Sequence, residues 1–366
     1  MNFRLLSILL ASASLATALQ AQENSLPLNP KVATNGYFNH LDLGLNAGST
    51  GVGIDLAAPI GPAVRLRAGF TYMPRFEMTS NFGMQVGDEE YKRTYDPVTG
   101  ERTDRLGRMI DYMYNMTGML MKDNVDMKYK PTYYNSKVLV DVYPLRDKRW
   151  HVTAGFYWGS KEIGRAVNSV EDAQTLSGVS MYNYIYDKVI EGNPNIFGDL
   201  ISITPDMLDQ ISPLFKSAGR MGFPVGHYKE ELRGQVPVLD DWGFPMYDDD
   251  DNPIYEDGVI RAKGAFYMMT PDPETGTVKC KAYAKRFKPY VGAGYSGTIS
   301  KDGLWHLDVD AGALFWGGSP DIYTHDGTCL TRDVENIGGK VGRYVDFISQ
   351  FKVFPVLELR ISRRLF

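Results

Sequence analysis

Several features that define common classes of protein are missing from this chain. Beyond the N-terminal segment no run of eighteen or more apolar residues occurs, so we expect no membrane-spanning helix. Only two cysteines occur in 366 residues, which excludes a disulfide-framework protein. The net charge of −5 argues against nucleic acid as a partner. The chain has no G-x-S-x-G, no H-E-x-x-H and no phosphate-binding loop, and we expect no cofactor.

The first segment, Met1 to about Ala21, has the composition of a secretory signal peptide. Arg4 supplies the charged start, Leu5 to Leu19 the apolar stretch, and small residues up to Ala21 the cleavage zone. An uncleaved anchor helix is disfavoured because the apolar run is short and rich in Ala and Ser. We therefore expect residues 1–21 to be removed and residues 22–366 to be exported, with any membrane span made of strands.

Apolar and polar residues alternate in eight segments of the exported part. In the last segment, Leu357, Leu359 and Ile361 share one face and alternate with charged or hydroxyl side chains. Eight such segments indicate an all-β transmembrane protein, an antiparallel up-and-down barrel in which lipid-facing and lumen-facing residues alternate. An even number allows closure, which removes the open edges that hydrocarbon does not tolerate. The predicted strands are His40–Gly48, Val52–Ala58, Val64–Tyr72, Ser136–Tyr143, Trp150–Gly159, Phe287–Ser296, Trp305–Phe315 and Phe351–Phe366.

The connections between the predicted strands are long on one side only. Those at 49–51, 59–62, 144–149 and 300–303 are short, whereas the other three have roughly 55, 125 and 35 residues, against a norm of a few. The long ones define insertions at about 74–130, 161–286 and 317–350. Bacterial outer-membrane barrels have short periplasmic turns and longer extracellular loops. We therefore expect an outer-membrane protein with periplasmic termini and large extracellular α+β insertions.

The inward-facing residues of the predicted strands are charged, and the outward-facing ones are apolar. A soluble barrel such as a lipocalin would have the opposite arrangement, and that is the main alternative. Trp150 and Trp305 each begin a strand just after a short turn, where an aromatic girdle is expected. We expect the inward side chains to fill the lumen as a charge network, and the histidines to belong to it rather than to a catalytic site. The predicted network comprises Asp42, Asp55, Arg65, Arg67, Lys137, Asp141, His151, His306, Asp308, Asp310, Glu358 and Arg360.

The stretch from Leu41 to Pro59, continuing into Val64–Tyr72, resembles the first hairpin of outer-membrane barrels from Bacteroidota. In size and topology the chain is similar to the small eight-stranded barrels of the OmpA, OmpX and OmpW type. The resemblance covers the strands and none of the insertions, and its motif carries no catalytic residue. It implies contact with outer-membrane lipid and recognition of the C-terminal strand by the barrel-assembly machinery.

The insertions contain helix signals. A helix is predicted from about Asp104 to Met121, with a stripe of methionine and leucine at helical spacing. Such a stripe can form an adaptable binding groove, but packing of the helix on the barrel mouth or a neighbouring loop is favoured. Ser169 can cap a second helix that reaches about Ile190. Thr204 followed by Pro205 begins a third, which Pro213 should end or kink.

Two further clusters in the insertions are open to two interpretations each. The consecutive Asp248, Asp249, Asp250 and Asp251 suggest calcium, but they lack the alternating ligands of a calcium loop, and a solvated hairpin tip is favoured. Pro271–Gly276 is a second predicted hairpin tip. The aromatic cluster either stacks on a glycan or protein partner or builds the core of the insertion; its members are Tyr182, Tyr184, Tyr186, Trp242, Phe244 and Tyr247.

The two cysteines, Cys280 and Cys329, are expected to form a disulfide. Counting from the short turn at 300–303 puts Cys280 opposite about Asp321, on the segment that leads to Cys329. Export exposes the chain to an oxidising environment, and no other thiol competes. Two free thiols are the alternative.

Together, these features favour a non-enzymatic outer-membrane barrel that presents an extracellular domain for surface interaction, ligand binding or envelope structure. Its possible partners are an extracellular protein or a glycan. Two alternatives remain. One is a narrow channel for small solutes, and the other is a barrel-embedded enzyme that modifies lipid or cleaves protein.

Overall fold

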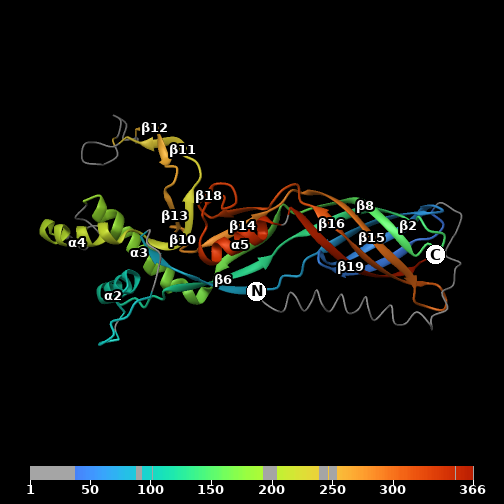
Figure 1. Ribbon diagram of the computed structural model, residues 1–366, viewed down its shortest axis with the longest axis horizontal. Coiled ribbons are helices and arrows are strands. Elements are labelled where there is room, and N and C mark those ends of the chain that lie inside the picture. Colours follow the sequence, from blue (N-terminus) through green and yellow to red (C-terminus); the bar gives the residue numbers. More distant parts are fainter. Residues whose placement is uncertain are drawn as a thin grey trace.

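The computed structural model describes residues 38–87, 93–100, 102–192, 204–238, 246, 254–350 and 352–365. Figure 1 shows an elongated molecule, with a bundle of long strands at one end and most of the helices at the other. We call the part outside the barrel the head. The predicted signal peptide, the aspartate run and Phe366 lie outside the described residues. Among the described residues, no helix combines the length and the apolar character needed to cross a membrane.

Eight antiparallel strands close into a barrel in the order β1-β19-β16-β15-β8-β7-β3-β2. Each strand pairs with its chain neighbour, and β1 pairs with β19 to close the ring, so the predicted fold is confirmed. The predicted bounds of the first and last strands differ from the observed bounds by at most about two residues. The strands are β1 (Asp42–Gly48), β2 (Gly51–Gly61), β3 (Val64–Tyr72), β7 (Tyr134–Val142), β8 (Trp150–Gly159), β15 (Phe287–Thr298), β16 (Trp305–Phe315) and β19 (Val353–Arg364).

The outer surface of the barrel is apolar between two groups of aromatic side chains. Trp150 packs edge-on against Tyr295 at the end with the short turns, with ring centroids 5.2 Å apart. Trp158 and Phe287 approach each other at the end next to the head, 6.4 Å apart. Along β16 the stretch from Trp305 to Phe315 spans about 33 Å, or about 25 Å after the usual strand tilt, which is the height of a transmembrane band.

The three long insertions all leave the barrel at one end and form the head (Figure 1). Five strands of the head form a second sheet in the order β17-β14-β9-β6-β4. These strands follow or precede β16, β15, β8, β7 and β3 in the chain, in the same neighbour order as in the barrel. The barrel wall therefore continues into the head on one side. The strands are β4 (Met78–Gly83), β6 (Asn124–Pro131), β9 (Glu162–Asn168), β14 (Lys279–Tyr283) and β17 (Asp321–Thr324).

The register shows how the two sheets join. Tyr290 lies opposite Leu314 in the barrel, and Cys280 lies opposite Thr324 in the head, so this strand pair continues without a slip. The neighbouring pair of β14 and β9 shifts by one residue near Ile163, because Ala282 pairs with Gly164 and Tyr283 with Glu162. Such a bulge reverses the alternation, so residues of β9 beyond it point to the opposite face of the sheet from the one that the alternation before the bulge predicts.

The head has its own hydrophobic core beneath one face of this sheet. The core joins helices α2 (Arg105–Thr117), α3 (Ala173–Ile190) and α4 (Pro205–Ala218) with a small sheet of β5 (Gln85–Val86), β10 (Met221–Tyr228), β13 (Phe266–Met269) and β18 (Val334–Glu335). Helix α5 (Gly339–Ser349) packs against β10 and leads into β19. The hairpin of β11 (Leu232–Pro237) and β12 (Tyr255–Arg261) extends from this body.

The helices of the head agree with the predictions in position and differ at their ends. Asp104 caps α2 by accepting a hydrogen bond from the backbone of Gly107, but the helix ends at Thr117 because Gly118 adopts a left-handed φ of 73°. Met113 is fully buried, which supports packing rather than an open groove for this face. Helix α4 continues through Pro213 to Ala218, so the helix does not end at that proline.

The predicted disulfide is not formed, and both cysteines are free. Cys280 lies opposite Thr324 rather than Asp321, and Cys329 pairs with Tyr323 on the other edge of the same strand, β17. A whole strand therefore separates the two cysteines. Two strand spacings amount to about 9.5 Å, beyond the about 7 Å that a disulfide can bridge. Because neighbouring residues of β17 point to opposite faces, the two thiols also do so.

Candidate functional site: the barrel interior

The interior of the barrel is filled by charged side chains, and Arg67 is at its centre. Its guanidinium donates to Asp141 at 2.8 Å and to both carboxylate oxygens of Asp310, at 2.8 and 3.2 Å. These partners come from β7 and β16, on different sides of the barrel. The Arg67 side chain is almost completely buried, so its charge has to be compensated by neighbouring carboxylates such as these.

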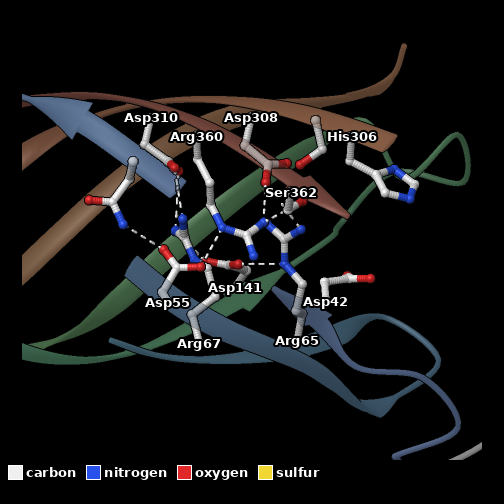
Figure 2. A network of polar contacts seen from close by, with 12 residues as sticks. Asp42, Asp55, Arg65, Arg67, Asp141, His306, Asp308, Asp310, Arg360 and Ser362 are labelled. Atoms are coloured by element: carbon white, nitrogen blue, oxygen red, sulfur yellow. Dashed lines mark hydrogen bonds and ion pairs between the residues drawn. The ribbon is translucent and has the colours of Figure 1, made fainter. Parts of the chain in front are cut away.

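A second arginine, Arg360 of β19, forms ion pairs with carboxylates of β2 and β16 (Figure 2). Its guanidinium donates to Asp55 at 2.5 Å and to Asp308 at 2.7 Å. Arg65 lies beside it, bonded to Asp141 at 2.8 Å and 3.5 Å from Asp308. The three guanidinium groups therefore alternate with carboxylates along the lumen, and each of these three carboxylates contacts two cations.

The network continues toward the head through Lys137. Its ammonium group donates to Glu358 at 2.5 Å and lies 3.5 Å from Asp55. Asn46 also donates to Asp55, at 2.9 Å. The charges of the lumen balance, with six of each sign: Asp42, Asp55, Asp141, Asp308, Asp310 and Glu358 against Arg65, Arg67, Lys137, Lys288, Arg360 and Arg364.

Small inward residues make room for these long side chains. A Cβ atom on Gly44 would lie 2.5 Å from Nε of Arg360 and 2.6 Å from a carboxylate oxygen of Asp55. A Cβ on Gly294 would lie 2.5 Å from both Asp310 and His151. Alternation of glycine with charged residues on inward faces is therefore a requirement of the packed lumen.

One histidine, His151, belongs to the network, toward the end of the barrel with the short turns. His151 is buried and contacts Asp310 at 2.7 Å through Nε2, while its Nδ1 lies 3.3 Å from Oγ of Ser296. The series Ser296, His151 and Asp310 has the residue types of a catalytic triad. However, Arg67 already pairs with Asp310, and the His151 ring is buried within the lumen.

The other two members of the predicted network, Asp42 and His306, both lie at the end of the barrel with the short turns. Asp42 is 3.8 Å from both His40 and Arg364, and Nδ1 of His306 is 3.4 Å from the hydroxyl of Thr298. Figure 2 shows Asp42 and His306 beside the arginine row rather than within it. The structure thus brings the ten other predicted residues into one connected set and leaves these two at its edge.

A layer of buried apolar side chains lies in the lumen on the side of the head. Tyr157 and Tyr290 pack edge-on there, with ring centroids 5.6 Å apart. They are buried together with Leu139, Leu314 and Val356. Side chains therefore occupy the barrel at two successive levels, one ionic and one apolar.

Some polar residues of the lumen were not among the predicted members of the charge network. Thr153 donates to Asp141 at 2.8 Å, and Ser362 accepts from Arg360 at 3.0 Å. Lys288 is buried near the head and donates to Asn135 at 3.0 Å. All of these residues occupy inward positions of the alternation, and Lys288 and Asn135 would have been found by extending that pattern along the whole of β15 and β7.

The other predicted sites fall in the head. Tyr182 is buried and stacks on Phe215 at 5.4 Å, so it belongs to the core, whereas Tyr184 is 46% exposed. Tyr186 is half-buried and packs against the same core. The other three candidates for a stacking platform, Trp242, Phe244 and Tyr247, and the aspartates 248–251 lie outside the described residues. In the described part of the chain, no group of three or more His, Cys, Asp or Glu side chains is arranged to hold a metal ion.

Fold and interior define a closed eight-stranded barrel with an apolar exterior and an ion-paired lumen. No protein-family model matches the chain, and no curated protein matches it. Among solved structures it is similar to CarO2 of Acinetobacter baumannii (11% identity over 89% of this chain and 98% of that chain, TM-score 0.33). It is also similar to CarO of the same organism (12% identity over 88% of this chain and 96% of that chain, TM-score 0.32). A third similar structure is a major outer membrane protein from Thermus thermophilus (10% identity over 89% of this chain and 98% of that chain, TM-score 0.26). TM-scores of this size assign neither a family nor a function.

Proposed function

We propose that this protein is a non-enzymatic outer-membrane barrel whose lumen is closed and whose head is held at the cell surface for interaction with other molecules. The observation that carries the proposal is the ion-paired interior. Arg67 and Arg360 have no exposed surface, and their carboxylate partners come from several strands around the barrel.

The exterior supports a position within a membrane. Leu45 is 66% exposed, and Val152, Val52 and Ile54 are each about half exposed on the outer face of the barrel. A soluble barrel would have to expose this continuous apolar band to water, which a monomeric soluble protein rarely does. The aromatic side chains at both ends of the band match the girdles of outer-membrane barrels.

The closed lumen leads to a direct test in planar lipid bilayers. We expect the protein to insert without steady single-channel conductance, because ionic and apolar side chains fill the lumen at successive levels. A control in which Arg67 and Tyr157 are both replaced by serine shortens one side chain in each layer. This control should conduct, which verifies insertion. Large, steady conductance of the unchanged protein would contradict the proposal.

A narrow channel for small solutes is the second candidate, and one observation favours it. Among the described residues, Nη2 of Arg65, Nε of Arg67 and Nη2 of Arg360 have no hydrogen-bond partner in the protein. Polar atoms of this kind bind water readily. The bilayer recordings separate the two candidates, because a hydrated path through the network gives measurable ion flow.

The orientation is tested on intact cells. We propose that the head is extracellular, because all long connections share one end of the barrel. External protease should then cut at the exposed hairpin tip of Asp272–Gly276, where Pro273, Glu274 and Thr275 are solvent-exposed. Cleavage there only after cell lysis would place the head in the periplasm.

A further inference from the structure

A group of cations lies on the outer surface where the barrel meets the head. The segment from Lys279 to Lys288 contains five cationic residues and no acidic residue. Lys281, Tyr283, Lys285 and Phe287 are alternate residues, and all but the half-buried Tyr283 are exposed. They form one line that leads from the head sheet down to the aromatic girdle, because β14 and β15 keep the same register across their junction.

Lys161 belongs to the same surface, although it comes from the connection between β8 and β9. Its ammonium group lies 5.7 Å from the ring centroid of Tyr283. We call Lys161, Lys281 and Lys285 the rim cations. Within the part of the chain that the structure describes, none of them has a carboxylate partner.

The acidic residues on the neighbouring strands are already compensated. Glu162 and Asp321 both lie opposite Tyr283 in the sheet. Glu162 accepts from Arg165 at 2.8 Å, and Asp321 lies 3.7 Å from Arg332. The rim cations therefore keep an uncompensated charge of about three units on one small surface, which attracts anions.

The height of this surface matches the headgroup layer of a membrane. Lys285 precedes Phe287 by two residues, and Lys161 follows Trp158 by three. At about 3.3 Å per residue and the usual strand tilt, Lys281, six residues before Phe287, lies about 15 Å beyond the girdle, where it adds to the attraction of anions. Lys285 and Lys161 lie closer, about 5 to 8 Å beyond the girdle. This distance is the thickness of one headgroup layer.

We infer that the rim cations bind the phosphate of an anionic lipid headgroup, while the acyl chains of that lipid lie on Phe287, Trp158 and the apolar barrel wall. The inference rests on the proposed membrane location. A lipid is favoured over a free anion or an acidic protein, because the cations lie directly above the apolar band and the two surfaces are continuous.

The test uses the full chain in non-ionic detergent, with native mass spectrometry to count bound lipid. Phosphatidylglycerol and phosphatidylcholine are added at equal concentrations, and inorganic phosphate is added in a separate arm. The variant replaces Lys161, Lys281 and Lys285 with glutamine. The control replaces three exposed cations of the head, Arg108 of α2, Lys216 of α4 and Lys263 between β12 and β13, and changes the net charge equally. Figure 1 shows these elements away from the barrel.

We expect the unchanged protein and the control to prefer phosphatidylglycerol. Each lysine near an anionic membrane surface contributes about fivefold in affinity, so the variant should bind phosphatidylglycerol roughly 100-fold more weakly. Equal binding by the variant and the control would overturn the inference, and so would equal binding of the two lipids by the unchanged protein. Displacement of phosphatidylglycerol by inorganic phosphate would identify a free-anion site instead.

Vesicle flotation of the same proteins distinguishes this inference from the proposed function. If all three proteins float with vesicles and bind phosphatidylglycerol alike, the rim cations do not recognise lipid, but the barrel is still a membrane protein. If the unchanged protein does not associate stably with vesicles, the membrane location itself is wrong.

Discussion

Replacement of Arg67 by methionine tests whether the lumen is a dry, ion-paired interior. The side chain is fully buried and neutralises Asp141 and Asp310 through three short contacts. Methionine fills a similar volume without charge and leaves one carboxylate in excess. Breaking a buried ion pair by removal of one partner costs about 3–5 kcal/mol.

The cost should be at the lower end of that range, because each carboxylate keeps another partner. Asp141 still accepts from Arg65 and Thr153, and Asp310 still contacts His151. We therefore expect a loss of about 3 kcal/mol in the free energy of unfolding, which is a factor of about 150 in the unfolding equilibrium constant.

The double variant Arg67→Met with Asp310→Asn is the matched comparison. It removes one charge of each sign, so no buried charge is left in excess, and its stability should return to within about 1 kcal/mol of the unchanged protein. Unfolding by urea in lipid vesicles, followed by tryptophan fluorescence, measures all three proteins. If the single variant loses less than about 0.5 kcal/mol, the charges are screened by water, and the closed-lumen interpretation is refuted.

Three further predictions concern the barrel wall, the head core and the thiols. Val140→Arg, at the middle of the lipid face, should cost about 2–4 kcal/mol in vesicle unfolding, whereas Val140→Leu should be nearly neutral; equal effects would contradict the assigned facing. In α2, Met113→Ala should lower the stability of the head by about 2–5 kcal/mol and the 41% exposed Met116→Ala by far less, as measured by thermal unfolding; equal losses would mean that the stripe is not core. Burial raises the pKa of Cys280 to about 12, so this thiol should resist alkylation at pH 8 in the folded protein. Both cysteines should react in denaturant without reductant, and detection of a disulfide by mass spectrometry would show that the chain rearranges on export.

The sequence alone determined the barrel because its signal is local. Alternation with period two identifies a strand and the facing of each residue from a few neighbours. The inward positions of Arg67, Asp308 and Arg360, and the exit of every long insertion at one end, therefore followed without knowledge of the tertiary structure.

Only the tertiary structure decided which charges meet. Arg67 and Asp310 are 243 residues apart, and Arg360 and Asp55 are 305 apart. Such pairs depend on the closure and stagger of the barrel, which alternation within one strand does not specify. The same limit explains the cysteines. A count from one turn gave an approximate partner for Cys280, but the course of the chain after β17 placed Cys329 on the far side of that strand.

The sequence also did not predict that the barrel wall continues into the head as a second sheet. Only a few residues separate β6 from β7 and β14 from β15. These residues include Thr132 and Arg286, which are not residue types that mark the end of a strand. Whether a strand ends at such a break or resumes in a second sheet depends on the strands beside it. Backbone pairing across five neighbours, together with the core that the head packs beneath one face, makes continuation the stable outcome.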